Sequence, residues 1–241
     1  MIFLRSFIIL SFIIFIVDAE ALAQDTEDYE YTSEFIWGIN KNTNSGLIGG
    51  LMVKYSKAIT PRMFQTFGVE VVNVKHPKEQ RYPSYTGNYF IFGKSNYLYS
   101  VRGQYGREWL VFKKAPQQGI QINAILAAGP TIGVVAPYFV EVAVDRGESV
   151  NEQYNPNVHD YSQILGTGNI LQGIGKSSLN IGGNIKSSII FEFGTFKNNV
   201  TGFEAGFLLE GFPKDVVLIP QAENRNIFTS AFITLFYGSR R

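Results

Sequence analysis

The 241-residue sequence contains no cysteine and only two histidines. Without cysteine the chain cannot form a disulfide scaffold, a thiolate metal site, an iron–sulfur cluster or a cysteine nucleophile, and it carries no N-terminal cysteine for lipid attachment. Two histidines leave few ligands for a transition metal. We therefore expect no metal, no other cofactor and no thiol chemistry.

Charge is also scarce, since 17% of the residues are charged and the formal net charge is +1. A dedicated nucleic-acid-binding protein would show a basic excess, so we expect no nucleic-acid partner. A disordered chain would contain fewer aromatic residues than the 15% present here. The length fits one domain of ordinary size.

The strongest apolar run lies at the N-terminus. Arg5 precedes the apolar segment Phe7 to Val17, and Ala21-Leu22-Ala23 forms a small-residue cleavage motif. This arrangement is typical of a secretory signal peptide. We predict a signal peptide at 1–23, cleavage between Ala23 and Gln24, and a polar leader at 24–33. No later run has the 18 or so apolar residues of a transmembrane helix, so the exported chain is either soluble or crosses a membrane by strands.

Apolar and polar residues alternate with a period of two along most of the remaining chain, which predicts β-strands. Eight segments carry this pattern: 34–42, 46–58, 63–75, 96–113, 119–144, 179–196, 200–212 and 226–238. The fifth is overlong and contains Pro130 and Pro137. It is either one bent strand or a strand whose far part stands clear of the sheet.

The connections between these segments sort by length. Three are tight and three are longer: 59–62, 115–118 and 197–199 against 76–95, 145–178 and 214–225. The first connection, 42–45, breaks the pattern because it is short. Short turns at one end and longer loops at the other are typical of a bacterial outer-membrane barrel.

One face of the predicted strands is apolar and aromatic, and the other carries nearly all of the strand charges. We predict that the polar face lines a lumen with a network of charged residues: Glu34, Lys54, Glu70, Arg102, Glu108, Lys186, Glu192, Glu204 and Glu210. The interior of an eight-stranded barrel is just wide enough for side chains, so these charges must pair. The carboxylates outnumber the cations, and we expect bound water or a protonated glutamate. For Glu34 and Glu108, near strand ends, a solvated face is the alternative.

Tyrosine and tryptophan lie toward the strand ends, as in the interfacial girdles of membrane barrels. The predicted interfacial aromatics are Trp37, Tyr55, Tyr97, Trp109 and Tyr237. A soluble β-sandwich would place the apolar face in its core, and alternation alone does not exclude it. Strand lengths near the 9–11 residues that cross a bilayer, and glycines on the polar face, favour the barrel. The predicted fold is an all-β, eight-stranded antiparallel transmembrane β-barrel with a filled lumen, over residues 34–241.

The signal ending Ala21-Leu22-Ala23-Gln24, the eight alternating strands and the closing segment Ile227 to Tyr237 resemble a small outer-membrane β-barrel protein of Bacteroidota-type Gram-negative bacteria. The resemblance covers the mature chain and is one of pattern. The closing segment resembles the signal read by the barrel-assembly machinery, although Gly238 to Arg241 follow its last aromatic residue. The resemblance implies an outer-membrane location, contact with membrane lipid including lipopolysaccharide, and that machinery as a partner during insertion.

Residues with catalytic potential are few. His159-Asp160-Tyr161-Ser162 brings base, acid and nucleophile types together, but neighbours in a loop rarely form a triad. The longer loops are the expected functional surface, and 76–95 offers the aromatic residues Tyr82, Tyr85, Tyr89 and Phe90 to a partner, although ordinary interfacial anchoring explains them equally well.

These observations favour a non-catalytic structural or accessory subunit that presents its extracellular loops to an envelope protein complex, with no catalytic residues. Three alternatives stay open: a lipid-modifying enzyme with its site at the barrel rim, a small channel, and a soluble periplasmic lipocalin-like binder. A channel would need an open lumen and more strands.

Overall fold

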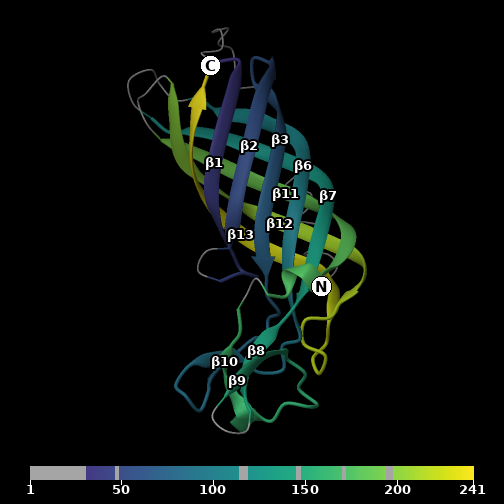
Figure 1. Cartoon of the computed structure of the whole chain (residues 1–241). Coiled ribbons are helices and arrows are strands. Elements are labelled where there is room, and N and C mark those ends of the chain that lie inside the picture. Colours follow the sequence, from purple (N-terminus) through teal and green to yellow (C-terminus); the bar gives the residue numbers. More distant parts are fainter. Residues whose placement is uncertain (1–30, 47–48, 114–118, 145–147, 170–171, 194–197) are drawn as a thin grey trace, which may run out of the picture. The chain divides into compact units, whose positions relative to one another are not determined.

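The computed structural model describes residues 31–46, 49–113, 119–144, 148–169, 172–193 and 198–241. Ala23 and Gln24 of the predicted cleavage site, and most of the predicted leader, lie outside these residues. Eight strands form a closed barrel (Figure 1). In barrel order they are β1 (Ser33–Asn42), β13 (Arg225–Arg240), β12 (Asn199–Val216), β11 (Ser178–Phe193), β7 (Gln121–Pro137), β6 (Asn96–Phe112), β3 (Met63–Val74) and β2 (Gly50–Thr60).

Every neighbouring pair in the barrel is antiparallel, and the pairing of β1 with β13 closes it. The predicted eight-stranded antiparallel barrel is therefore confirmed. Closure satisfies the backbone hydrogen bonds of all eight strands and leaves no open sheet edge. Among the described residues, no helix is both long enough and apolar enough to span a bilayer.

The overlong fifth segment is two strands rather than one. β7 ends at Pro137, and β8 (Phe139–Ala143) leaves the barrel to pair with β9 (Ser149–Gln153) and β10 (Ile164–Thr167). Pro137 has no N–H to donate, and the N–H of Tyr138 donates to the carbonyl of Ser95 at 2.8 Å. Because β8 pairs with β9 and β10, the far part of the segment stands clear of the barrel, which was one of the two predicted alternatives.

The longer connections form a small subdomain at the end of the barrel where β7 ends and β11 begins, which we call the loop end. A hairpin of β4 (Arg81–Pro83) and β5 (Tyr89–Ile91) precedes β6, and the β10–β8–β9 sheet and the 3₁₀ helices η2 (Tyr161–Gln163) and η3 (Ile174–Lys176) lie between β7 and β11. The three-stranded sheet is labelled in Figure 1. The subdomain has one apolar core: Phe90, Tyr97, Ala136, Tyr138, Val140, Val142, Tyr154 and Ile164.

Burial alternates along the barrel strands, as in β1, where every second residue from Glu34 to Asn42 is buried. The buried set faces the lumen, which is narrow. A Cβ atom added at Gly206 on β12 would lie 2.6 Å from the Cβ of Ser188 on β11. The two strands can therefore lie this close only because residue 206 has no side chain. Glycines on the inner face therefore allow a tightly filled interior.

Candidate functional site

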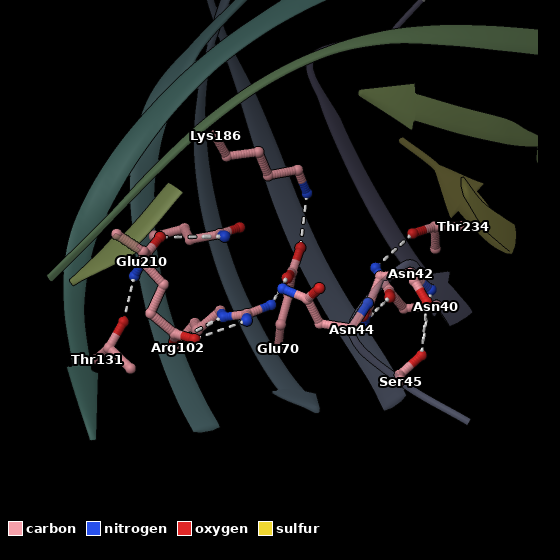
Figure 2. Close-up of polar contacts among 12 residues, drawn as sticks. Asn40, Asn42, Asn44, Ser45, Glu70, Arg102, Thr131, Lys186, Glu210 and Thr234 are labelled. Atoms are coloured by element: carbon pink, nitrogen blue, oxygen red, sulfur yellow. Dashed lines mark hydrogen bonds and ion pairs between the residues drawn. The ribbon is translucent and has the colours of Figure 1, made fainter. Parts of the chain in front are cut away.

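The structure places all nine predicted lumen charges on the inner face, and none is more than 6% exposed. Glu34 and Glu108, for which a solvated face was the alternative, are among them. Figure 2 shows part of this network, with Lys186 directed at Glu70 and Arg102 at Glu210. A buried charge is tolerated only when it is paired and hydrogen-bonded.

The central part of the network joins four strands. Arg102 on β6 donates two hydrogen bonds of 2.9 Å to Glu210 on β12, a bidentate pairing that fixes both side chains. Lys186 on β11 lies 2.7 Å from Glu70 on β3 and 2.9 Å from Glu204 on β12. These contacts tie opposite walls of the barrel together.

A second group lies toward the end of the barrel that holds the C-terminus. Lys54 is 2.7 Å from Glu108, which also accepts a hydrogen bond of 2.6 Å from Asn123. Arg240 donates to Glu34 at 2.8 Å and binds Glu192 through both of its terminal nitrogens.

Arg240 is the charged lumen residue that sequence reasoning missed. The last strand was predicted to end at residue 238, whereas β13 continues to Arg240. The alternation of inward positions from Phe228 through Phe236 places residue 240 on the inner face, so extending the strand by two residues would have identified it. Its guanidinium lies 3.9 Å from the centre of the Tyr31 ring, which also stacks on Phe64.

Within the described part of the lumen, six carboxylates face four cations. The carboxylates are Glu34, Glu70, Glu108, Glu192, Glu204 and Glu210, and the cations are Lys54, Arg102, Lys186 and Arg240. One oxygen each of Glu70 and Glu204 has no hydrogen-bond partner. A cavity of about 10 Å³ beside Glu70, Lys54 and Lys186 has room for about one water molecule. Bound water or a protonated glutamate remains the prediction for the surplus negative charge.

The lumen is filled with apolar side chains at the loop end. Seven of them form one buried cluster: Val72, Val74, Leu98, Phe212, Val216, Leu218 and Phe228. Leu218 belongs to the segment 217–224, whose backbone accepts hydrogen bonds from Asn96, Ser95 and the His76 ring. Because this end is apolar and covered, the interior is a packed core, and the small-channel alternative lacks the open lumen that it needs.

The outward face of the barrel is apolar. Exposed side chains include Ile181 at 72%, Phe207 at 73% and Leu235 at 66%, on three different strands. A closed barrel that is charged inside and apolar outside is stable with lipid, not water, around it. The chain is an outer-membrane β-barrel.

Comparison with known proteins finds similarity at the level of the fold. No protein-family model and no curated protein matches the sequence. Among solved structures, the chain is similar to Neisserial surface protein A (10% identity, 88% of this chain and 98% of that one, TM-score 0.40). It is also similar to the attachment invasion locus protein Ail of Yersinia pestis (10%, 88% and 100%, 0.41). The N-terminal β-barrel domain of Pseudomonas aeruginosa OprF is a further such structure (9%, 88% and 98%, 0.33). A Bacteroidota-type origin stays a prediction.

Four of the five predicted interfacial aromatics lie on the outward face of the barrel. Trp37, Tyr55, Trp109 and Tyr237 are each at least 40% exposed, and the Trp37 and Tyr237 rings meet edge to face at 6.3 Å. Tyr97 is the exception, because it is only 9% exposed. Its ring packs against Tyr138 in the loop subdomain, so Tyr97 anchors the loops and does not face lipid.

The residues of the predicted partner surface also divide into exposed and buried ones. Tyr82, Tyr85 and Tyr89 are 40%, 87% and 60% exposed, whereas Phe90 is 1% exposed. Residues alternate faces along β5, so Phe90 points into the loop core while Tyr89 points out. The prediction that Phe90 belongs to the surface is therefore wrong.

Two further aromatic residues complete the exposed group. Phe92 and Tyr161 are 42% and 44% exposed, and the ring of Phe92 lies 6.0 Å from Tyr82 and 6.4 Å from Tyr161. We call Tyr82, Tyr85, Tyr89, Phe92 and Tyr161 the aromatic platform. Tyr82 and Tyr161 each lie beside Phe92. Tyr89 lies on the other face of the β4–β5 hairpin, because Tyr82 pairs with Phe90 and Tyr89 with Pro83. Sequence reasoning missed Phe92, which lies in the same loop as Tyr82, and Tyr161, whose proximity to Phe92 depends on the fold of two separate loops.

The loop subdomain is also held by a buried ion pair. Lys94 is fully buried, and its ammonium lies 2.7 Å from Glu79 and 4.3 Å from the centre of the Tyr97 ring. Burial lowers the pKa of Lys94, and the Glu79 carboxylate offsets part of that shift. Burial also raises the pKa of the Tyr138 and Tyr154 hydroxyls. Lys94, Tyr138 and Tyr154 are therefore part of the buried interior of the loop subdomain.

The loop histidines have structural partners. The Nδ1 atom of His159 accepts a hydrogen bond from the Asn155 N–H, its Nε2 atom lies 3.2 Å from Glu152, and its ring stacks on Tyr154. These partners of His159 include neither Asp160 nor Ser162. In the part of the chain that the structure describes, no group of three or more acidic or histidine side chains could hold a metal ion.

We expect Phe90→Ala to loosen the loop subdomain without unfolding the barrel. Removing a buried phenylalanine costs about 3–5 kcal/mol, and Phe90 packs in the loop core only. Limited proteolysis should cut the variant within 76–95 and 138–177 at least tenfold faster than the unmodified chain. Heat-modifiable migration, which reports the barrel, should be unchanged.

Tyr85→Ala is the matched control, since it removes an aromatic side chain that is 87% exposed in the same hairpin. Its loops should resist the protease as well as those of the unmodified chain. Equal cleavage of the Phe90 and Tyr85 variants would contradict the assignment of Phe90 to the core.

Proposed function

We propose that this chain is a non-catalytic outer-membrane protein that presents its extracellular loops to an envelope protein partner, as a structural or accessory subunit. The observation that carries the proposal is the aromatic platform. Aromatic residues supply much of the binding energy at protein interfaces, and rigid ones lose little entropy on binding. Here their loops are held by the buried core and by the Lys94–Glu79 pair.

The filled lumen supports the same proposal. Its charged side chains are engaged with one another across the barrel, which suits a structural wall. We further propose that the barrel-assembly machinery inserts the chain through its closing strand, where Ile227, Ile233, Leu235 and Tyr237 form an exposed apolar row. Lipid, including lipopolysaccharide in the outer leaflet, surrounds the rest of the apolar face.

Co-purification of the tagged chain from native membranes in a mild detergent tests the proposal. A partner should be recovered in a fixed ratio with the unmodified chain. It should be lost, at least tenfold, with the variant Tyr82→Ser/Tyr85→Ser/Tyr89→Ser, because three exposed aromatic side chains, of the kind that supply most binding energy at interfaces, are gone. The control Val158→Ser/Ile174→Ser alters two exposed apolar residues outside the platform and should keep the partner.

Two results would overturn this proposal. One is recovery of the unmodified chain as a monomer without any stoichiometric partner. The other is equal recovery of the partner with both variants, which would place the contact away from the platform.

A further inference from the structure

A polar row interrupts the apolar outer face of the barrel near its C-terminal end. Lys57 on β2 lies directly opposite Gln65 on β3, and Gln65 lies opposite Arg107 on β6. All three side chains occupy outward positions. Neighbouring strands are about 4.8 Å apart, so the Lys57 and Arg107 backbones are about 10 Å apart with Gln65 between them.

Aromatic residues border this row on both sides. Toward the middle of the barrel lie Tyr55, Phe67 and Tyr105, which are opposite one another on the same three strands, and the Phe67 and Tyr105 rings are 5.1 Å apart. Toward the strand ends lies Trp109, opposite Met63. Tryptophan and tyrosine at this depth are typical of the interface between acyl chains and headgroups.

The hydrogen-bonding capacity of Arg107 is largely unused. Its guanidinium lies 5.5 Å from the centre of the Tyr105 ring, and its Nη1 atom is covered and has no hydrogen-bond partner among the described residues. No ion pair connects Lys57 or Arg107 to a described carboxylate. The row thus offers two uncompensated cations and one amide, which is the donor set that a phosphate accepts.

The depth of the row fits a headgroup layer. On β3 the next polar outward residue toward the loops is Asn73, eight residues after Gln65, and on β1 it is Lys41. Eight residues span about 26 Å along a strand, or about 20 Å across a membrane for a strand tilted by about 40°. The apolar band of such barrels is about 25 Å tall, so the two polar levels lie within a few ångströms of its two edges.

We propose that Lys57, Gln65 and Arg107 bind the phosphate of one glycerophospholipid in the periplasmic leaflet. The row lies at the end with the tight 61–62 turn, and short turns face the periplasm in outer-membrane barrels. Lys57 and Arg107 neutralise the phosphodiester, Gln65 donates to it, and the acyl chains lie along the Tyr55, Phe67 and Tyr105 rings.

Native mass spectrometry of the full chain, purified in detergent and stripped of lipid, tests this site. Added dioleoyl phosphatidylethanolamine should give a saturable adduct of one lipid per chain. The variant Lys57→Gln/Arg107→Gln should bind it at least about tenfold more weakly, because two charge-assisted contacts are lost. Arg107→Lys, which keeps the charge, should bind more tightly than the double variant. Heat-modifiable migration verifies that each variant is folded.

The control Lys214→Gln/Arg225→Gln removes the same charges at the loop end, where both residues are exposed, and should bind as the unmodified chain does. Dioleoylglycerol, which lacks the phosphate, and glycerol phosphate, which lacks the chains, should not give the saturable adduct. Binding that is equal in the double variant, or equal for dioleoylglycerol, would overturn the proposal. Equal binding of glycerol phosphate would also overturn it, in favour of a site for free phosphate.

Discussion

Arg240→Met is expected to lower the free energy of unfolding of the barrel by about 3–5 kcal/mol. Arg240 compensates two carboxylates in the lumen, Glu34 and Glu192, which are 6% and 1% exposed. Without the guanidinium, two negative charges remain buried with much of their compensation lost. Unfolding by urea in lipid vesicles, followed by the gel shift between folded and unfolded barrel, measures the change.

The next residue supplies the matched control. Arg241 follows the last strand and is exposed, so Arg241→Met should leave the urea midpoint almost unchanged. Replacing the whole triad by neutral groups, in Arg240→Met/Glu34→Gln/Glu192→Gln, should restore much of the lost stability, since the uncompensated charges are then gone. An equal effect of the two arginine variants would contradict the role of Arg240 in the lumen.

Arg240 also shows what period-two alternation predicts about the barrel and what it does not. The pattern determines which face each strand residue occupies, and it identified the inward glutamates and three of their four cationic partners. It does not determine where a strand ends, because polar residues on an inner face resemble those of a turn. The final Ser-Arg-Arg was therefore left outside the predicted strand, whereas the pairing of β13 with β1 continues to Arg240.

Tyr97 and Phe90 show a second limit of the same reasoning. Both are aromatic residues in or beside a long loop, where sequence alone predicts exposure to lipid or to a partner. Their burial depends on β8 leaving the barrel after Pro137 and packing over them, which brings Tyr138 and Tyr154 into contact. Contacts between residues so far apart in the chain are tertiary and leave no local pattern.

The ion pairs across the lumen belong to the same class of information. Alternation predicted that Lys186 and Glu70 share the interior, but they are 116 residues apart, and only the order and stagger of the strands decides that they meet. The barrel closure therefore selects the partners from a set that the sequence had already placed on one face.

Lys186→Met is expected to destabilise the barrel by about 3–5 kcal/mol, an effect similar to that of Arg240→Met. Lys186 contacts both Glu70 and Glu204, and each of these glutamates already has one oxygen without a hydrogen bond. Arg102 lies 3.6 Å from Glu70 and compensates it in part, whereas Glu204 would keep its hydrogen bond from Ser188 and the more distant charge of Lys54. The urea midpoint measures the loss, with Lys176→Met, an exposed lysine of the loops, as the control.

The compensated variant Lys186→Met/Glu70→Gln/Glu204→Gln separates a charge effect from a packing effect. If buried charge causes the loss, the triple variant should recover most of the stability, because methionine fills the space of the lysine stem and the amides need no counter-ion. If the stem packing causes it, the triple variant should stay as unstable as Lys186→Met. Recovery would show that the charges of the lumen network are stable because they neutralise one another. Continued instability would show that side-chain fit in the narrow interior contributes more to stability than charge pairing does.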